Sequence, residues 1–152
     1  GKDITIVSMS YMTVEGLLAK DFLEKHYNIY CEIIDLRTIS PLDVDTIYRS
    51  VSKTKKLLVL DTGYASGSVA GEIIAKVCME KHDDLDSPPA RLAMPDVPEP
   101  TSFGLTKDFH ITAKNVVEKV LAMFKIQPED NLKSLSRDEN HDVPGDWFKG
   151  PF

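Results

Sequence analysis

The four histidines are the first residues to consider, because imidazole groups bind metals and transfer protons near neutral pH. They are His26, His82, His110 and His141. None lies four residues from another histidine or beside a cysteine pair, so their spacing predicts no metal site. His26 and His82 fall at the ends of predicted helices, where a cation complements the helix dipole. His110 lies in a predicted loop before a helix. It is either a residue of a functional site or an ordinary polar residue of the surface.

A glycine-bearing segment follows the third predicted strand and leads into the third predicted helix. Its candidate residues for binding an anion or a partner are Gly63, Tyr64, Ser66, Gly67 and Ser68. Exposed N–H groups at the start of a helix attract anions. The glycine spacing differs from the G-x-G-x-x-G dinucleotide motif, and the alternative is that these glycines permit a tight turn and close packing. The sequence also has no G-x-S-x-G elbow and no Walker A motif.

Carboxylates are the remaining candidates for acid–base chemistry. Those at informative positions are Glu15, Asp35, Asp61 and Glu72. Glu15 and Glu72 each lie in the first turn of a predicted helix, where the helix dipole alone favours an acidic side chain. Asp35, Arg37 and Asp43 flank one short loop, and we interpret them as a structural ion-pair cluster. We therefore predict no catalytic, metal-binding or cofactor-binding residue in this chain.

Length and composition indicate one globular domain of 152 residues with a formal net charge of -6. A mildly acidic chain without basic clusters is not typical of proteins that bind nucleic acid or anionic membranes. No apolar run reaches the length of a membrane span. Cys31 and Cys78 lie far apart in apolar contexts, which indicates buried thiols in a reducing compartment. We expect a soluble protein of the cytoplasm, or of an organelle matrix in a eukaryote.

Strands and helices alternate along the sequence. Apolar, β-branched runs predict strands over residues 4–8, 29–34, 56–61 and 90–94. Thr13 is the predicted cap of a first helix whose buried face carries Val14, Leu17, Leu18 and Phe22. Further helices are predicted after Asp43, from residue 69, and after a Thr112 cap. This order predicts an α/β fold, a three-layer α/β/α sandwich with a mostly parallel sheet of about four to five strands.

The domain is predicted to span residues 1–126, followed by a polar extension over 127–152 with an aromatic end. Gly1 stands where a methionine would begin a complete chain, so we interpret the sequence as a piece of a longer protein. The aromatic end holds Trp147, Phe148 and Phe152, which is an unusual composition for a free tail. These side chains are candidates for contact with this domain or with a partner. A disordered terminus is the alternative.

Three motifs resemble a known family. Residues 34–43 (IDLRTISPLD), 61–73 (DTGYASGSVAGEI) and 91–100 (RLAMPDVPEP) are similar, in order and spacing, to motifs of the beta subunit of thiamine-dependent 2-oxo acid dehydrogenases. The resemblance covers about residues 3–125. Thr62, Tyr64 and the Ser66–Ser68 stretch depart from the usual pattern. The substrate, whether pyruvate, a branched-chain 2-oxo acid or acetoin, therefore stays open.

The resemblance implies the transketolase C-terminal fold, with the strand order 2-1-3-4 and a further antiparallel strand before residue 1. In the intact enzyme of this family, thiamine diphosphate and Mg²⁺ bind between the alpha subunit and the other half of the beta subunit. The corresponding GDG motif is absent from this chain. The domain helps to build the tetramer and docks the acyltransferase, which implies three partners: a second beta subunit, the alpha subunit and the acyltransferase component.

These observations leave three hypotheses. The first is an assembly and partner-docking domain of the decarboxylating component of a 2-oxo acid dehydrogenase complex, expected to form homo-oligomers and to be inactive alone. The second is a regulatory module that binds a small anion or a nucleotide between residues 8–11 and 63–68. The third is a stand-alone enzyme, although the sequence lacks any assembled acid, base or nucleophile constellation. Within the family resemblance, the same domain from another transketolase-like enzyme is a further alternative.

Overall fold

The structure is a computed structural model that describes residues 1–106 and 109–136. The strands are β1 (Ile4–Ser8), β2 (Cys31–Asp35), β3 (Leu57–Tyr64) and β4 (Ala90–Met94). The α-helices are α1 (Met12–Tyr27), α2 (Val44–Thr54), α3 (Val69–Glu80), α4 (Phe103–Thr106) and α5 (Ala113–Met123). Two 3₁₀ helices are η1 (His82–Asp84) and η2 (Asp130–Leu135).

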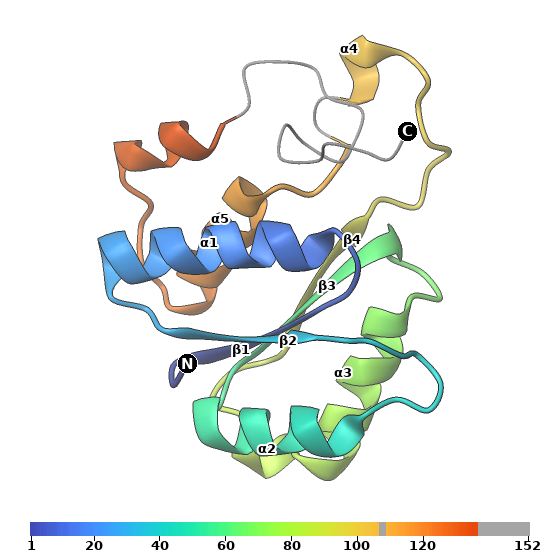
Figure 1. Cartoon of the computed structure of the whole chain (residues 1–152), viewed down its shortest axis with the longest axis vertical. Coiled ribbons are helices and arrows are strands. Elements are labelled where there is room, and N and C mark those ends of the chain that lie inside the picture. Colours follow the sequence, from blue (N-terminus) through green and yellow to red (C-terminus); the bar gives the residue numbers. More distant parts are fainter. Residues whose placement is uncertain (107–108, 137–152) are drawn as a thin grey trace.

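The four strands form a parallel sheet in the order β2-β1-β3-β4. Helices α1 and α5 cover one face of the sheet, and α2 and α3 cover the other (Figure 1). Both the predicted sandwich and the predicted strand order are confirmed. None of the helices in the described part of the chain is long and apolar enough to cross a membrane.

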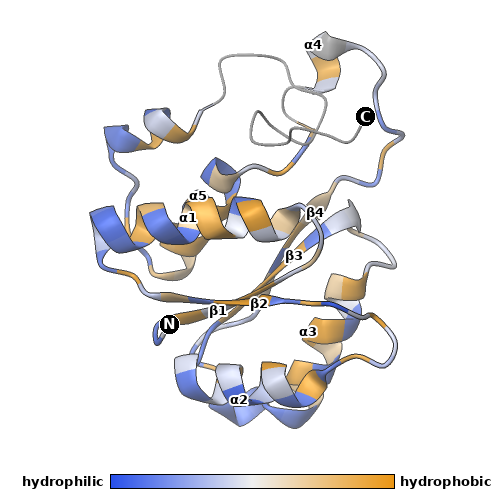
Figure 2. Cartoon of the chain, viewed as in Figure 1, coloured by the Kyte–Doolittle hydropathy of each residue, from blue (hydrophilic) through white to orange (hydrophobic). Residues whose placement is uncertain are grey.

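The central strands are buried on both faces, as parallel strands between helices require. Ile4 and Ile6 of β1 pack toward α1 and α5, whereas Val7 packs toward α2 and α3. Leu58 and Leu60 of β3 also pack toward α1 and α5, and the residue between them packs toward α2 and α3. Figure 2 shows hydrophobic colour along these strands, between the two helical layers.

One polar cluster interrupts the apolar core beneath α2. The buried Thr5 hydroxyl of β1 lies 2.6 Å from the hydroxyls of both Ser50 and Thr54. The Thr54 hydroxyl also lies 3.1 Å from the Ser50 carbonyl oxygen that accepts its hydrogen bond. Each hydroxyl therefore has a partner, so the cluster joins strand to helix without leaving a buried polar group unsatisfied.

The predicted start and buried face of the first helix are wrong in part. Helix α1 begins at Met12, and its buried residues include Met12, Gly16 and Ala19 as well as Phe22, which was predicted. Leu17 and Leu18 are instead 44% and 43% exposed. Small residues explain the choice of face, because a Cβ at Gly16 would already lie 3.4 Å from Cδ1 of Leu60. The face of α1 that carries small residues packs on the sheet, and the two leucines face outward.

Two further details of the loops differ from expectation. The third strand continues to Tyr64, so Gly63 and Tyr64 lie in β3 and not in the loop. The predicted ion-pair cluster forms only in part, because Arg37 pairs with Asp35 while Asp43 accepts hydrogen bonds from Thr46 and caps α2. A backbone N–H at a helix start is a fixed donor close to the carboxylate, which favours capping over a longer-range ion pair.

Residues after 126 return to the domain surface before the described part ends. Leu132 of η2 is buried against the α1–α5 core, and the Tyr27 hydroxyl donates to Asn131 at 3.2 Å. The predicted boundary at residue 126 stays a prediction. His141 and the predicted contact residues Trp147, Phe148 and Phe152 lie outside the described residues.

Candidate functional site

The carboxyl edge of the sheet is where a ligand site is expected in this topology. The chain reverses its order between β1 and β3, and ligands of open α/β sheets bind at such a switch point. The segments there are the β1–α1 loop, the β3–α3 loop and the residues after β4. Ser66, Gly67 and Ser68 lie in the β3–α3 loop, and Gly63 and Tyr64 lie at the adjoining end of β3.

The start of α3 is already occupied by a carboxylate of the same chain. Asp61, which is buried in β3, accepts hydrogen bonds from the backbone N–H of Ala70 at 3.0 Å and from that of Gly63 at 2.8 Å. Ser68 caps the helix and accepts from Gly71 at 3.3 Å. The N–H groups of Gly63, Ala70 and Gly71, which a bound anion could otherwise use, therefore have acceptors within the chain.

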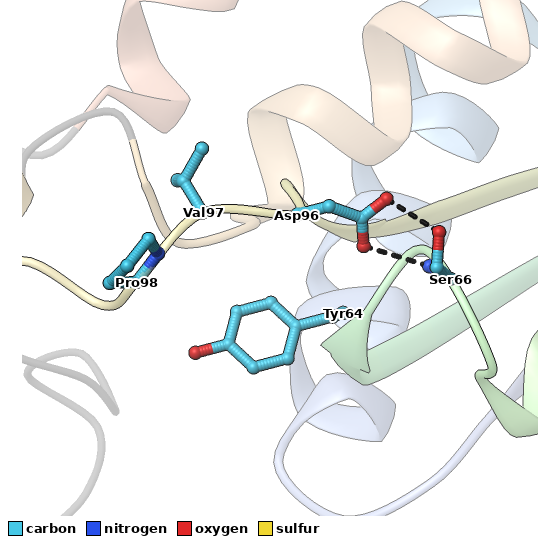
Figure 3. A pocket seen from close by; sticks show the side chains of 5 residues that line it. All are labelled: Tyr64, Ser66, Asp96, Val97 and Pro98. Carbon is cyan, nitrogen blue, oxygen red and sulfur yellow. Dashed lines mark hydrogen bonds between the residues drawn. The ribbon is translucent and has the colours of Figure 1, made fainter.

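The rest of the β3–α3 loop is tied to the segment after β4. The backbone N–H and the hydroxyl of Ser66 both donate to Asp96, at 2.9 and 2.7 Å (Figure 3). These hydrogen bonds hold the pKa of the Asp96 carboxyl below its usual range, the backbone bond being the larger cause. Gly67 has a φ of 71°, so the predicted tight turn is present at this glycine.

Hydrogen-bonded side chains also join the two ends of the facing β1–α1 loop. The Ser8 hydroxyl lies 3.0 Å from the hydroxyl of Thr13, which donates to Asp35 at 2.9 Å. Thr13 was predicted to cap the first helix, but it serves to join β2, β1 and α1. These hydroxyls are thus engaged in holding the strand ends together.

The carboxyl edge consequently has few free donors and several negative charges. Asp35, Asp61 and Asp96 all lie there, and the backbone N–H groups of residues 63, 66, 70 and 71 all donate to acceptors of the same chain. A second anion would meet like charge in place of a positive field. This arrangement can position loops, but it offers no cradle for phosphate.

The described residues also fail to fit thiamine diphosphate with Mg²⁺. Within residues 1–106 and 109–136, no group of three or more His, Cys, Asp or Glu side chains could hold a metal ion. A diphosphate would need the backbone donors that Asp61 and Asp96 already engage. The chemistry of a thiamine enzyme therefore cannot be assigned to this set of residues.

An open hollow of about 430 Å³ lies beside the Ser66–Asp96 contact. It is lined by Tyr64, Ser66, Asp96, Val97 and Pro98 (Figure 3). Figure 3 shows the Tyr64 ring extending below Val97 and toward Pro98. The sequence analysis singled out Tyr64 and Ser66 but missed the other three, because only the parallel pairing of β3 with β4 brings the two segments together.

His110 and Cys31 are both buried side chains. His110 is buried, its Nε2 lies 3.7 Å from Oε1 of Glu99, and its Nδ1 has no hydrogen-bond partner among the described residues. Burial is the main cause that raises the pKa of the Cys31 thiol to about 12. A thiol that stays protonated at neutral pH is a poor nucleophile. Cys78 is less buried, and both cysteines are free.

The sequence analysis also missed the role of Glu15. It lies in the first turn of α1, as predicted, but its carboxylate is fully buried and accepts a hydrogen bond from Ala113 at 2.7 Å. The sequence showed only an acidic residue in the first turn of a helix, which the helix dipole alone explains. Its partner is 98 residues away, so the sequence could not identify it.

The fold is an α/β domain in which loop donors at the carboxyl edge are hydrogen-bonded to side chains of the same chain. Comparison with known proteins identifies the class of this domain. Residues 1–116 match the family described as "Transketolase, C-terminal domain". The chain belongs to this family. The solved structure titled "Split gene transketolase, inactive beta4 tetramer" superposes with a TM-score of 0.68 at 25% identity, covering 84% of this chain and 40% of that chain.

The relatives narrow the class further. The chain is 44% identical over 126 residues to the mitochondrial pyruvate dehydrogenase E1 component subunit beta of Chaetomium thermophilum, which covers 83% of this chain and 33% of the relative. It is 36% identical over 124 residues to the same component of Bacillus subtilis, covering 78% of this chain and 38% of that protein. The chain is thus a transketolase C-terminal domain that is similar to pyruvate dehydrogenase E1 beta subunits, and it spans about a third of these relatives' length.

Proposed function

We propose that this domain serves to assemble and dock the beta subunit of a thiamine-dependent 2-oxo acid dehydrogenase. Its partners are a second beta subunit, the alpha subunit and the acyltransferase component. The intact enzyme decarboxylates a 2-oxo acid oxidatively, with pyruvate favoured by the names of the relatives. It works in the cytoplasm, or in the mitochondrial matrix if the protein is located like the Chaetomium relative.

The observation that carries this proposal is the outward pair Leu17 and Leu18 of α1. Neighbouring leucines that are each more than two-fifths exposed leave apolar surface in water, and covering such surface is favourable by roughly 25 cal/mol per Å². Adjacent exposed apolar side chains on one helix are typical of a surface that another chain covers. A subunit interface over α1 accounts for them.

Thiamine diphosphate and Mg²⁺ supply the decarboxylation chemistry in the proposed intact enzyme, and residues outside this chain bind them. The residues of this domain hold strand ends, cap helices and exclude water from the core. This division agrees with a carboxyl edge whose donors are engaged by Asp61 and Asp96. We expect the isolated chain to show no decarboxylation of any 2-oxo acid.

The test is association of the wild-type chain and of a Leu17→Glu, Leu18→Glu variant. Light scattering after size exclusion gives the oligomeric state, and co-purification with the alpha subunit and the acyltransferase gives partner binding. Two buried charges at an apolar interface are strongly unfavourable, so the variant should lose association. Loss of at least one of these associations is the expected result.

Met79 provides a matched control, because it is an apolar side chain of α3 that is 80% exposed on the opposite helical layer. Met79→Glu adds charge to a surface without altering α1 and should associate as the wild type does. A wild-type chain that stays monomeric at every concentration and binds neither partner contradicts the proposal. Circular dichroism of each variant establishes that the fold is retained.

A further inference from the structure

The hollow beyond the carboxyl ends of β3 and β4 presents apolar surface that no described residue covers. Tyr64 is 42% exposed and Val97 is 52% exposed, and Pro98 completes the wall (Figure 3). Residues 147–152 of the same chain, WFKGPF, contain its only tryptophan and two of its six phenylalanines. We propose that this segment binds intramolecularly in the hollow, with the Trp147 ring against Tyr64 and Val97.

The chemistry of the two surfaces is complementary. Aromatic rings pack favourably in offset or edge-to-face arrangements, so Tyr64 offers a surface that suits an indole or phenyl ring. The Asp96 carboxylate lies on the rim and stays ionised, because Ser66 donates two hydrogen bonds to it. Lys149 follows Phe148 directly, so an ammonium group arrives together with the rings beside this carboxylate.

The connecting segment is long enough to reach the hollow. The described chain leaves η2 near Tyr27, which ends α1, whereas the hollow lies at the carboxyl edge, where α1 begins. The distance to cross is thus about the length of α1, whose 16 residues extend about 24 Å. From Ser136 to Trp147 there are 11 residues (147 minus 136), and they reach about 36 Å when extended.

Tethering favours this segment over a separate protein as the occupant. A linker of this length keeps the segment at an effective concentration on the order of 1 mM at the hollow. Even a weak contact is then mostly formed, without the entropy loss of bringing two molecules together. This inference does not rest on the proposed assembly function, because it uses a different surface from Leu17 and Leu18.

Trp147 is the only tryptophan, so its fluorescence reports the environment of this segment alone. In the wild-type chain, we expect emission at shorter wavelength than that of a synthetic peptide of residues 137–152. Val97→Asp should shift the emission to the peptide value and raise acrylamide quenching severalfold, because a carboxylate then enters the apolar wall. Tyr64→Ala should act in the same direction.

Two matched variants control for added charge. Met79→Asp changes an exposed side chain of α3 far from the hollow. Ile39→Asp changes a second hollow of about 350 Å³, which Ile39, Leu42, Val44 and Val69 line together with Glu72 and Lys76. Neither should alter Trp147 emission. Circular dichroism establishes that each variant keeps its fold.

Three outcomes overturn the proposal. Wild-type emission equal to that of the peptide means that the segment is not bound. A response to Ile39→Asp but not to Val97→Asp places the segment in the other hollow. Emission that depends on protein concentration means that a second copy provides the contact. The Leu17 and Leu18 variant should leave the emission unchanged, so failure of the assembly proposal is recognised separately.

Discussion

The carboxylate of Glu15 in α1 accepts a hydrogen bond from the backbone N–H of Ala113, with 2.7 Å between Glu15 Oε2 and the nitrogen. Ala113 is the first residue of α5, so this N–H is one of the donors that a helix cannot satisfy internally. The negative charge also faces the positive end of the α5 dipole. One side chain thus fixes the packing of the two helices that cover the same face of the sheet.

Replacing Glu15 with alanine should destabilise the fold by about 2–3 kcal/mol, because it leaves a buried donor without its charged acceptor. Glu15→Gln retains a neutral acceptor and should lose about half as much. Urea unfolding followed by circular dichroism measures both effects. Glu118→Gln removes only an exposed partner of Lys114 and should stay within about 0.5 kcal/mol of the wild type. Equal stability of Glu15→Ala and the wild type contradicts this role.

Replacing Asp61 with alanine should create an anion site at the start of α3. The variant frees the N–H groups of Gly63 and Ala70, and the loss of two hydrogen bonds to a buried carboxylate costs about 3 kcal/mol. Added acetate or phosphate should raise the melting temperature of the variant more than that of the wild type, because the anion replaces the missing carboxylate. Identical responses of the two proteins mean that Asp61 does not occupy an anion position.

Cys31 should make the protein less stable in alkali. Burial raises the pKa of this thiol from 9.0 to about 12, so the unfolded chain releases its proton at lower pH than the folded chain. The stabilising effect is complete below pH 9.0 and is lost as the pH rises toward 12. Each pH unit in this window should lower the free energy of unfolding by about 1.4 kcal/mol relative to Cys31→Ala.

The same burial predicts the order of thiol modification. In the folded chain at pH 8, Cys78 should react with an alkylating reagent first, and Cys31 only after denaturant is added. Mass spectrometry of the two tryptic peptides measures this order. Rapid labelling of Cys31 in the folded chain contradicts the buried position of this thiol.

The Thr5 hydroxyl should contribute to stability through Ser50 and Thr54. Thr5→Val keeps the shape of the side chain but leaves two buried hydroxyls short of a partner, at a cost of about 1–3 kcal/mol. Thr5→Ser keeps the hydroxyl and should cost less, apart from the lost methyl group. Chemical denaturation of both variants measures the difference, and a fully stable Thr5→Val argues against the cluster.

Patterns in the sequence predicted helices and strands well where the stabilising interactions join residues close together in the chain. Helices α2 and α5 begin directly after Asp43 and Thr112, as predicted, because a helix start depends on side chains and backbone N–H groups within a few residues of each other. The four predicted strands are present because their apolar runs suit a sheet buried on both faces. The strand order came from the family resemblance, since pairing joins residues far apart in the chain.

Only some residues of the candidate site could be recognised from the sequence. Gly67 was recognised as a turn residue from its type, and its positive φ confirms this. Asp96 and Val97 were not recognised as parts of the same place, since 30 residues separate Ser66 from Asp96. The hydrogen bond from the start of α3 to Asp61 could not be predicted either, because the sequence of a strand does not specify which group a carboxylate will contact.

The sequence by itself determined that this chain forms a doubly covered parallel sheet, since alternating apolar strands and helices have few other ways to bury their surface. Only the tertiary structure decided which side of α1 faces that sheet. Apolar residues lie on both sides of this helix, so periodicity favoured Leu17 and Leu18 equally well. Gly16 and Ala19 allow the closer approach, and Glu15 on that side can reach α5, so the leucines are left on the surface.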